Sequence, residues 1–161
     1  VRQQMRISLP LLGAISIALV GCATSGRSKD ALCEPLLDFA ESIGPGETKV
    51  ISFRTSWGGN FNDDPDPVIY AMRCEHGGYE PAKPACNYLM DHGAIEFSNN
   101  NAKRALSCLA DGTSFGEDID LLDGSFSIGF GTPDRGARLR IEYRSDDDLG
   151  GMLLRIEARG Y

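Results

Sequence analysis

The sequence has few of the residues that most often carry catalysis or hold a metal. Its only histidines are His76 and His92, and no two cysteines are separated by two residues. Structural zinc sites usually draw their ligands from closely spaced cysteines and histidines. Glu75 and Asp91 adjoin the histidines, but neighbours in sequence seldom share a face. A metal or hydrolytic role would need a third group supplied by the fold, so we expect no metal and no cofactor.

Long apolar runs are also scarce. The longest apolar run, from Ile7 to Gly21 and interrupted only by Ser8 and Ser16, is shorter than the roughly 20 residues that a membrane-spanning helix needs, and no second one follows. Arg2 and Arg6 precede it without any acid. A basic segment followed by a short apolar run is typical of a signal peptide, which we assign to residues 1–21.

The apolar run ends in Leu19-Val20-Gly21-Cys22, which resembles the lipobox of bacterial lipoproteins. The resemblance implies that a diacylglyceryl group is attached to the Cys22 thiol and that signal peptidase II cleaves after Gly21. The new Cys22 amine is then acylated, and two or more acyl chains hold a protein stably at a membrane. Ala23 stands where an aspartate would imply retention at the inner membrane. We therefore expect a lipid-anchored protein on the periplasmic face of the outer membrane.

Basic residues are in deficit after the signal peptide. The whole chain has 16 Lys+Arg and 23 Asp+Glu, and the predicted signal peptide contains two of the basic residues, Arg2 and Arg6. The remaining chain therefore has 14 basic and 23 acidic residues, a net charge of −9. A field of this sign repels nucleic acid and anionic lipid headgroups and steers cationic partners. The alternative is that the charge serves solubility alone. We predict a short tether over residues 22–29 and one globular domain over residues 30–161, which is long enough to bury its own core.

Four cysteines follow Cys22, and an even set in an exported domain predicts two disulfides. Three pairings of Cys33, Cys74, Cys86 and Cys108 are possible. We favour Cys33–Cys108 with Cys74–Cys86.

The apolar periodicity predicts an α+β fold. Helices are expected over residues 30–43, 81–92 and 99–110. Strands are expected over 49–55, 68–74, 119–122, 125–130, 137–144 and 152–159, with Asp123-Gly124 as a two-residue hairpin turn between the third and fourth. We expect an antiparallel sheet with a C-terminal meander and two to three helices packed on one face.

Residues 112–116 match the G-x-S-x-G pattern of serine hydrolases, with Ser114 at its centre. In those enzymes a strand precedes the serine and a helix follows. Here the predicted order is reversed and no histidine follows, so Gly112 is better explained as the end of a helix. We expect that the protein is not an enzyme.

Acidic residues form three clusters: Asp63, Asp64 and Asp66; Asp118, Asp120 and Asp123; and Asp146, Asp147 and Asp148. None fits the calcium-loop pattern. Solvated turn residues are the simplest interpretation, and a surface facing a basic partner is the alternative.

The first cluster follows Trp57 and Phe61, two large aromatics among flexible residues. Aromatics on loops often anchor binding surfaces. The alternative is that Trp57 folds back over the core. We take Trp57, Phe61, Asp63, Asp64 and Asp66 as the candidate partner-binding residues.

Four expectations favour a binding protein: the periplasmic location, the two disulfides, the acidic net charge and the lack of a credible active site. We expect an inhibitor of, or immunity protein against, a cationic peptidoglycan hydrolase. The domain resembles small periplasmic lysozyme-inhibitor and immunity lipoproteins only in general architecture. Their S-G-x-x-Y inhibitor motif is absent, which favours immunity to a dedicated toxin. The alternative is an accessory lipoprotein of an outer-membrane complex or secretion system.

Overall fold

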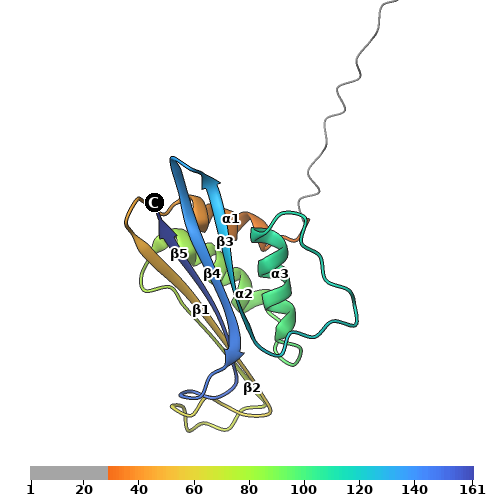
Figure 1. Ribbon diagram of the computed structural model, residues 1–161. Coiled ribbons are helices and arrows are strands. Elements are labelled where there is room, and N and C mark those ends of the chain that lie inside the picture. Colours follow the sequence, from red (N-terminus) through yellow and green to blue (C-terminus); the bar gives the residue numbers. More distant parts are fainter. Residues whose placement is uncertain (1–28) are drawn as a thin grey trace, which may run out of the picture.

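The computed structural model describes residues 29–161 and contains three α-helices, one short 3-10 helix and five strands within them (Figure 1). In chain order they are α1 (Cys33–Glu41), β1 (Thr48–Trp57), β2 (Tyr70–Glu75), the short 3-10 helix η1 (Glu80–Ala82), α2 (Lys83–His92), α3 (Asn99–Leu109), β3 (Gly124–Thr132), β4 (Arg135–Ser145) and β5 (Met152–Gly160). The predicted signal peptide, Cys22 and residues 23–28 lie outside the described residues. Within residues 29–161 no helix is long and apolar enough to cross a membrane.

The strands form one antiparallel sheet in the order β2-β1-β5-β4-β3. β3, β4 and β5 are the predicted C-terminal meander. β1 then pairs with β5 over eight residues, from Thr48 opposite Arg159 to Thr55 opposite Met152. This pairing joins the N-terminal hairpin to the meander.

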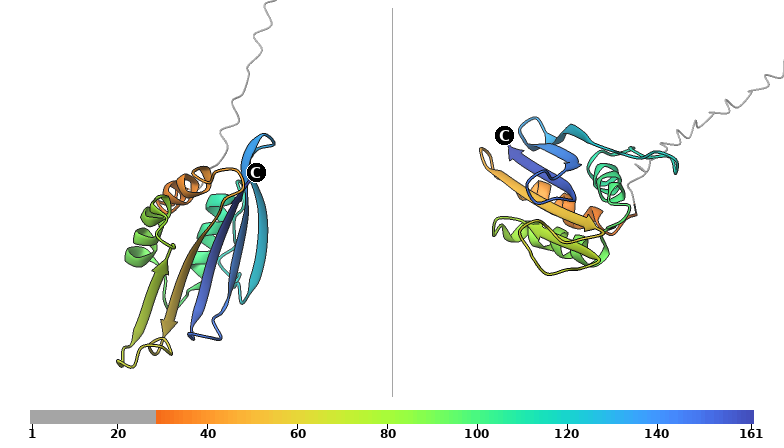
Figure 2. Two further views of the ribbon diagram at one scale, coloured as in Figure 1. Left: turned by 90° about the vertical axis from the view of Figure 1, so that its left-hand side faces the viewer. Right: turned by 90° about the horizontal axis from the view of Figure 1, so that it is seen from below.

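All three helices cover one face of the sheet, as predicted (Figure 2). The core between the two layers includes Ile51 and Phe53 of β1 and Leu139 and Ile141 of β4, each 1% exposed or less. Alternate residues of a strand point to opposite faces, so the residues between them face away from the helices. Each such side chain contributes about 1.5–3 kcal/mol when fully buried.

Both predicted disulfides are confirmed. Cys33–Cys108 ties α1 to α3 and Cys74–Cys86 ties β2 to α2, with sequence separations of 75 and 12. Each therefore fixes a helix to its neighbour in the fold. The longer loop removes more entropy from the unfolded chain, about 4 against about 3 kcal/mol.

The structure corrects the predictions for residues 119–124. Residues 119–122 form no strand, and Ile119 and Leu122 are 47% and 80% exposed because no partner strand covers them. Gly124 is the first residue of β3, lacks the positive φ of a type I′ turn, and pairs with Tyr143. The β3–β4 turn instead lies at residues 133–134.

We predict that the double substitution Cys33→Ser with Cys108→Ser lowers the free energy of unfolding more than Cys74→Ser with Cys86→Ser. The expected losses are about 4 and about 3 kcal/mol, because the first bridge closes the longer loop. Urea denaturation of each variant measures both values, with the reduced wild type as the control. A larger loss from the shorter loop would contradict the chain-entropy explanation.

Candidate functional site

Two loops that lie far apart in sequence meet at one end of the sheet (Figure 1). They are the β1–β2 loop and the β4–β5 turn, and we call residues 57–70 and 146–151 the hairpin end. The backbone N–H of Asn62 donates to the carbonyl of Leu149 at 2.8 Å, and its side-chain amide donates to the carbonyl of Asp148 at 3.1 Å. The two loops therefore form one surface.

Asp146 fastens the base of the hairpin end. It is 5% exposed, accepts a bond from Arg54 Nε at 2.7 Å, and accepts the backbone N–H groups of Asp148 and Leu149 at 3.2 and 3.1 Å. Burial alone would raise the pKa of Asp146, but the bonds from Arg54 and the two N–H groups outweigh it and the pKa lies below its usual value. Arg54 also donates to Glu75 at 2.6 Å. Asp146 is thus a structural acid and not the solvated turn residue that the sequence suggested.

Two of the predicted partner-binding residues, Phe61 and Asp63, make contacts within the protein that stabilise the β1–β2 loop. Arg73 donates to both oxygens of Asp63, at 2.7 and 3.0 Å, and the hydrogen bond from Arg73 lowers the pKa of Asp63. The same guanidinium lies over the ring of Phe61, 4.9 Å from its centroid. Phe61 is only 3% exposed. It does not face solvent, which corrects the expectation that both loop aromatics anchor a partner.

Trp57 does face solvent, so it does not fold back over the core. It is 56% exposed and lies directly opposite Tyr70, which is 51% exposed. Ile69 beside Tyr70 is 75% exposed. Asp64 and Asp66 are exposed as well, joined by a bond from the Asp66 N–H to Asp64 Oδ1. The hairpin end therefore presents three large apolar side chains beside two outward acids.

Ile69 and Tyr70 are not among the predicted partner-binding residues, because an alternating strand was expected over residues 68–74. β2 begins only at Tyr70. Among the alternate residues of the predicted strand, Met72 and Cys74 pack on the core, whereas Val68 and Tyr70 are exposed. The signal lay in the run Val68-Ile69-Tyr70. Three consecutive apolar residues exceed what one face of a strand can bury.

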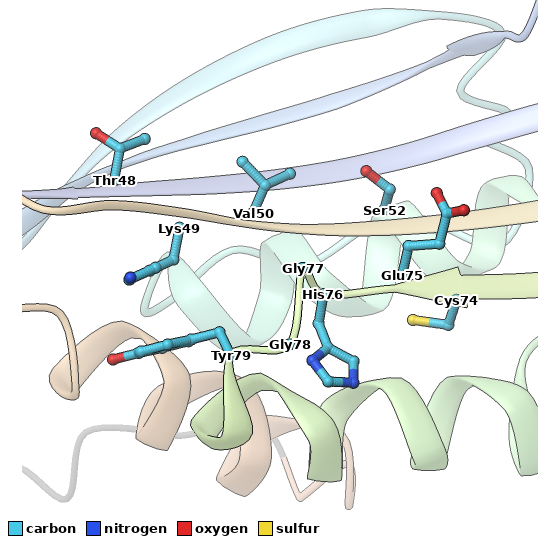
Figure 3. Close-up of a pocket in the computed structure, with 10 residues that line it drawn as sticks. All are labelled: Thr48, Lys49, Val50, Ser52, Cys74, Glu75, His76, Gly77, Gly78 and Tyr79. Carbon is cyan, nitrogen blue, oxygen red and sulfur yellow. The ribbon is translucent and has the colours of Figure 1, made fainter.

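An open groove lies at the other end of the β1 edge, where β2 leaves the sheet (Figure 3). It has a volume of about 840 Å³ and is lined by the start of β1, the end of β2 and residues 76–79. The N–H of Gly160 donates to the carbonyl of Glu47, and the N–H of Gly58 donates to the carbonyl of Ile69. Because backbone groups alternate in direction along an antiparallel strand, the odd-numbered residues of β1 hydrogen-bond toward β5 and the even-numbered residues toward β2. The backbone of Thr48 and Val50 consequently faces the groove. Such an edge is a template for pairing with another strand.

The potentially reactive side chains around this groove take part in contacts that stabilise the fold. Cys74 is in a disulfide, Glu75 binds Arg54, and the Lys49 ammonium lies 4.8 Å from the centroid of the Tyr79 ring. His76 points away from β1 (Figure 3), and its Nδ1 is buried without a hydrogen-bond partner among the described residues.

The other predicted candidates do not assemble into one site. Ser114 is exposed in the loop after α3, and His92 at the end of α2 packs against Tyr88 with ring centroids 4.7 Å apart. Within the described part of the chain, no hydrogen bond joins Ser114 to either histidine. Over the same residues, no three His, Cys, Asp or Glu side chains are grouped to hold a metal ion.

We predict that Asp146→Ala lowers the free energy of unfolding by about 2–3 kcal/mol, because it leaves the part-buried Arg54 with Glu75 alone. The pKa of Asp146 is lowered by folding, so its contribution is present above the unfolded value of about 3.9 and is lost as pH falls through the folded value. The wild type should therefore lose stability faster than the variant below pH 4. Thermal unfolding between about pH 2 and 7 tests this.

The exposed neighbour Asp147 provides the matched control. Asp147→Asn should leave both the unfolding free energy and its pH dependence within about 0.5 kcal/mol of wild type. Equal losses from the two substitutions would contradict the structural role of Asp146.

Comparisons of the chain with protein-family models, with curated proteins and with solved structures found no match.

Proposed function

We propose that the protein is a lipid-anchored periplasmic binding protein whose hairpin end holds a partner protein. The proposed partner is a cationic peptidoglycan hydrolase, which the protein inhibits or to which it gives immunity. One observation carries the proposal: Trp57, Ile69 and Tyr70, each more than half exposed, belong to the same hairpin end as the exposed Asp64 and Asp66. Exposed large apolar side chains rimmed by polar residues mark interaction surfaces.

The two kinds of side chain would do different work. Trp and Tyr are the residue types that most often dominate binding energy, because they bury a large area with few rotatable bonds. The acids act at longer range by raising the rate at which a cationic partner arrives. Asp63 is excluded from this role because its charge is already neutralised by Arg73.

The surface is also held in shape before any partner arrives. The Asp63–Arg73 pair, the stacking of Arg73 on Phe61 and the bonds of Asn62 to the β4–β5 turn order the loop from within. A preorganised surface binds more tightly because less conformational entropy is lost on association. Phe61 thus supports binding from beneath the surface.

The anchor is the first part of the proposal to test. We expect Cys22→Ser to abolish incorporation of labelled palmitate and to remove the protein from membrane fractions, because the thiol is the proposed attachment site. Ser25→Ala, which leaves Cys22 in place, should retain both. Label that persists on the Cys22→Ser protein would overturn the lipoprotein assignment.

The hairpin end is tested by binding kinetics against the product of any peptidoglycan hydrolase gene that neighbours the gene of this protein. Trp57→Ala should raise the dissociation rate by about thirtyfold, since a buried aromatic anchor is worth on the order of 2 kcal/mol. Asp64→Asn with Asp66→Asn should instead slow association. That effect should shrink in high salt, because exposed charges are screened beyond about 10 Å at 0.1 M.

Asp118→Asn removes an exposed acid outside the hairpin end and should change neither rate. Wild type that fails to bind the hydrolase, and fails to protect cells that express it in the periplasm, would refute the immunity proposal. The accessory-lipoprotein alternative predicts that outcome, together with stable co-purification with outer-membrane proteins.

A further inference from the structure

The sheet face turned away from the helices is rich in arginine although the protein is acidic. On β4 the buried residues Leu139 and Ile141 alternate with the exposed Arg138 and Arg140. The same alternation on the neighbouring strands brings seven arginines to this face: Arg54, Arg73, Arg138, Arg140, Arg144, Arg155 and Arg159.

Most of these guanidinium groups have a carboxylate within reach. Four of the seven form close ion pairs across or along the strands. They are Arg54 with Asp146 and Glu75, Arg73 with Asp63, Arg140 with Glu142 at 2.7 Å, and Arg155 with Glu157 at 2.6 Å. Charge on most of the face is therefore balanced locally.

Arg138 and Arg159 break this pattern. They are directly opposite each other on β4 and β5, and neither guanidinium group forms an ion pair or side-chain hydrogen bond with another described residue. Like charges directly opposite on antiparallel strands are destabilising, since their Cβ atoms lie about 5 Å apart. The flanking residues of the same row are Gly129 on β3 and Thr48 on β1, which add no charge. A Cβ atom at Gly129 would meet nothing within 4 Å, so space is open beside Arg138.

We propose that Arg138 and Arg159 bind the phosphate group of an anionic phospholipid headgroup. Two adjacent guanidinium groups offer planar, paired N–H donors that match the oxygens of a phosphate, and a phosphate between them removes their mutual repulsion. The site has a defined geometry, so it attracts an anion locally even though the net charge of the chain is negative.

The place of this pair in the fold selects a membrane as the source of the phosphate. The row lies where β4 begins and β5 ends, the same end of the sheet as the start of the described chain and the C-terminus (Figures 1 and 2). An extended chain from Cys22 to Lys29 spans at most about 25 Å. This step rests on the proposed lipid anchor, which would keep this end near the headgroups and leave the hairpin end pointing away.

The test uses a protein of residues 29–161, which contains the whole core described above and both disulfides but has no lipid attachment site. Co-sedimentation at low salt compares vesicles of phosphatidylcholine alone with vesicles that also contain phosphatidylglycerol. We expect binding only to the second kind. Arg138→Gln with Arg159→Gln should weaken it about thirtyfold.

Arg144→Gln is the matched control, because Arg144 is exposed on the same face at the other end of β4 and has no carboxylate partner among the described residues. It should bind like wild type. The double variant should be at least as stable as wild type in thermal unfolding, since it removes a repulsion. Inorganic phosphate should displace the protein from vesicles better than chloride at equal ionic strength.

Three results would overturn the proposal: no binding by wild type, equal weakening by Arg144→Gln, or equal displacement by phosphate and chloride. Wild type that binds inorganic phosphate but no vesicle would assign the pair to a soluble ligand and overturn the lipid assignment. The protein of residues 29–161 lacks Cys22, so its binding to vesicles does not depend on lipidation. If it binds no vesicles while the full-length protein incorporates palmitate, the arginine site is refuted and the anchor is not. A full-length wild type that incorporates no palmitate refutes the anchor alone.

Discussion

The pairing of β1 with β5 is the constraint on which the rest of the structure depends. It brings together strands from the two halves of the chain, and both supply core residues to the same face. Contacts this distant in sequence form only after a large loop has been closed, which costs conformational entropy. Favourable interactions between the two strands must offset that cost. Arg54 of β1 and Asp146 of the turn before β5 provide that hold at one end, and the bonds between residues 46–47 and Gly160 provide it at the other.

The same pairing creates the surfaces available for binding. β1 is longer than β2, so its first residues have a partner only in β5 and leave the open groove on the other side. At its far end β1 carries Trp57 to the hairpin end, opposite Tyr70. The register of β5 with β4 also places Arg159 against Arg138. A shift of one residue would turn these side chains to the opposite face.

The sequence was sufficient for features encoded over short distances. Apolar spacing of three and four residues located the helices because a helix satisfies its own backbone, and alternation located β1, β4 and β5. The disulfide pairing could be favoured but not fixed, since it depends on which helices meet. The prediction for residues 119–124 was wrong because Asp123-Gly124 has the chemistry of a turn but no strand before it.

Phe61 could not be distinguished from Trp57, because its burial involves contacts with residues outside its own loop segment, among them Arg73 on β2. Sequence composition gave the sign of the total charge but not its distribution over the two faces of the sheet.

That distribution changes how the acidity should be interpreted. A uniform negative surface would repel a membrane and attract a cationic protein from all sides. Here seven arginines gather on the sheet face, and four of them pair with acids, whereas Arg138 and Arg159 lie opposite each other with no acid partner among the described residues. Outward acids without an arginine lie beside the apolar residues of the hairpin end. These two features lie at opposite ends of the same sheet, the arginine pair on β4 and β5 and the acids beside β1 and β2, so charge of opposite sign is separated along the length of the sheet. A rigid antiparallel sheet preserves that separation. An anchored molecule held near lipid at one end would therefore present its acids and exposed aromatics to the periplasm without any rearrangement of the fold.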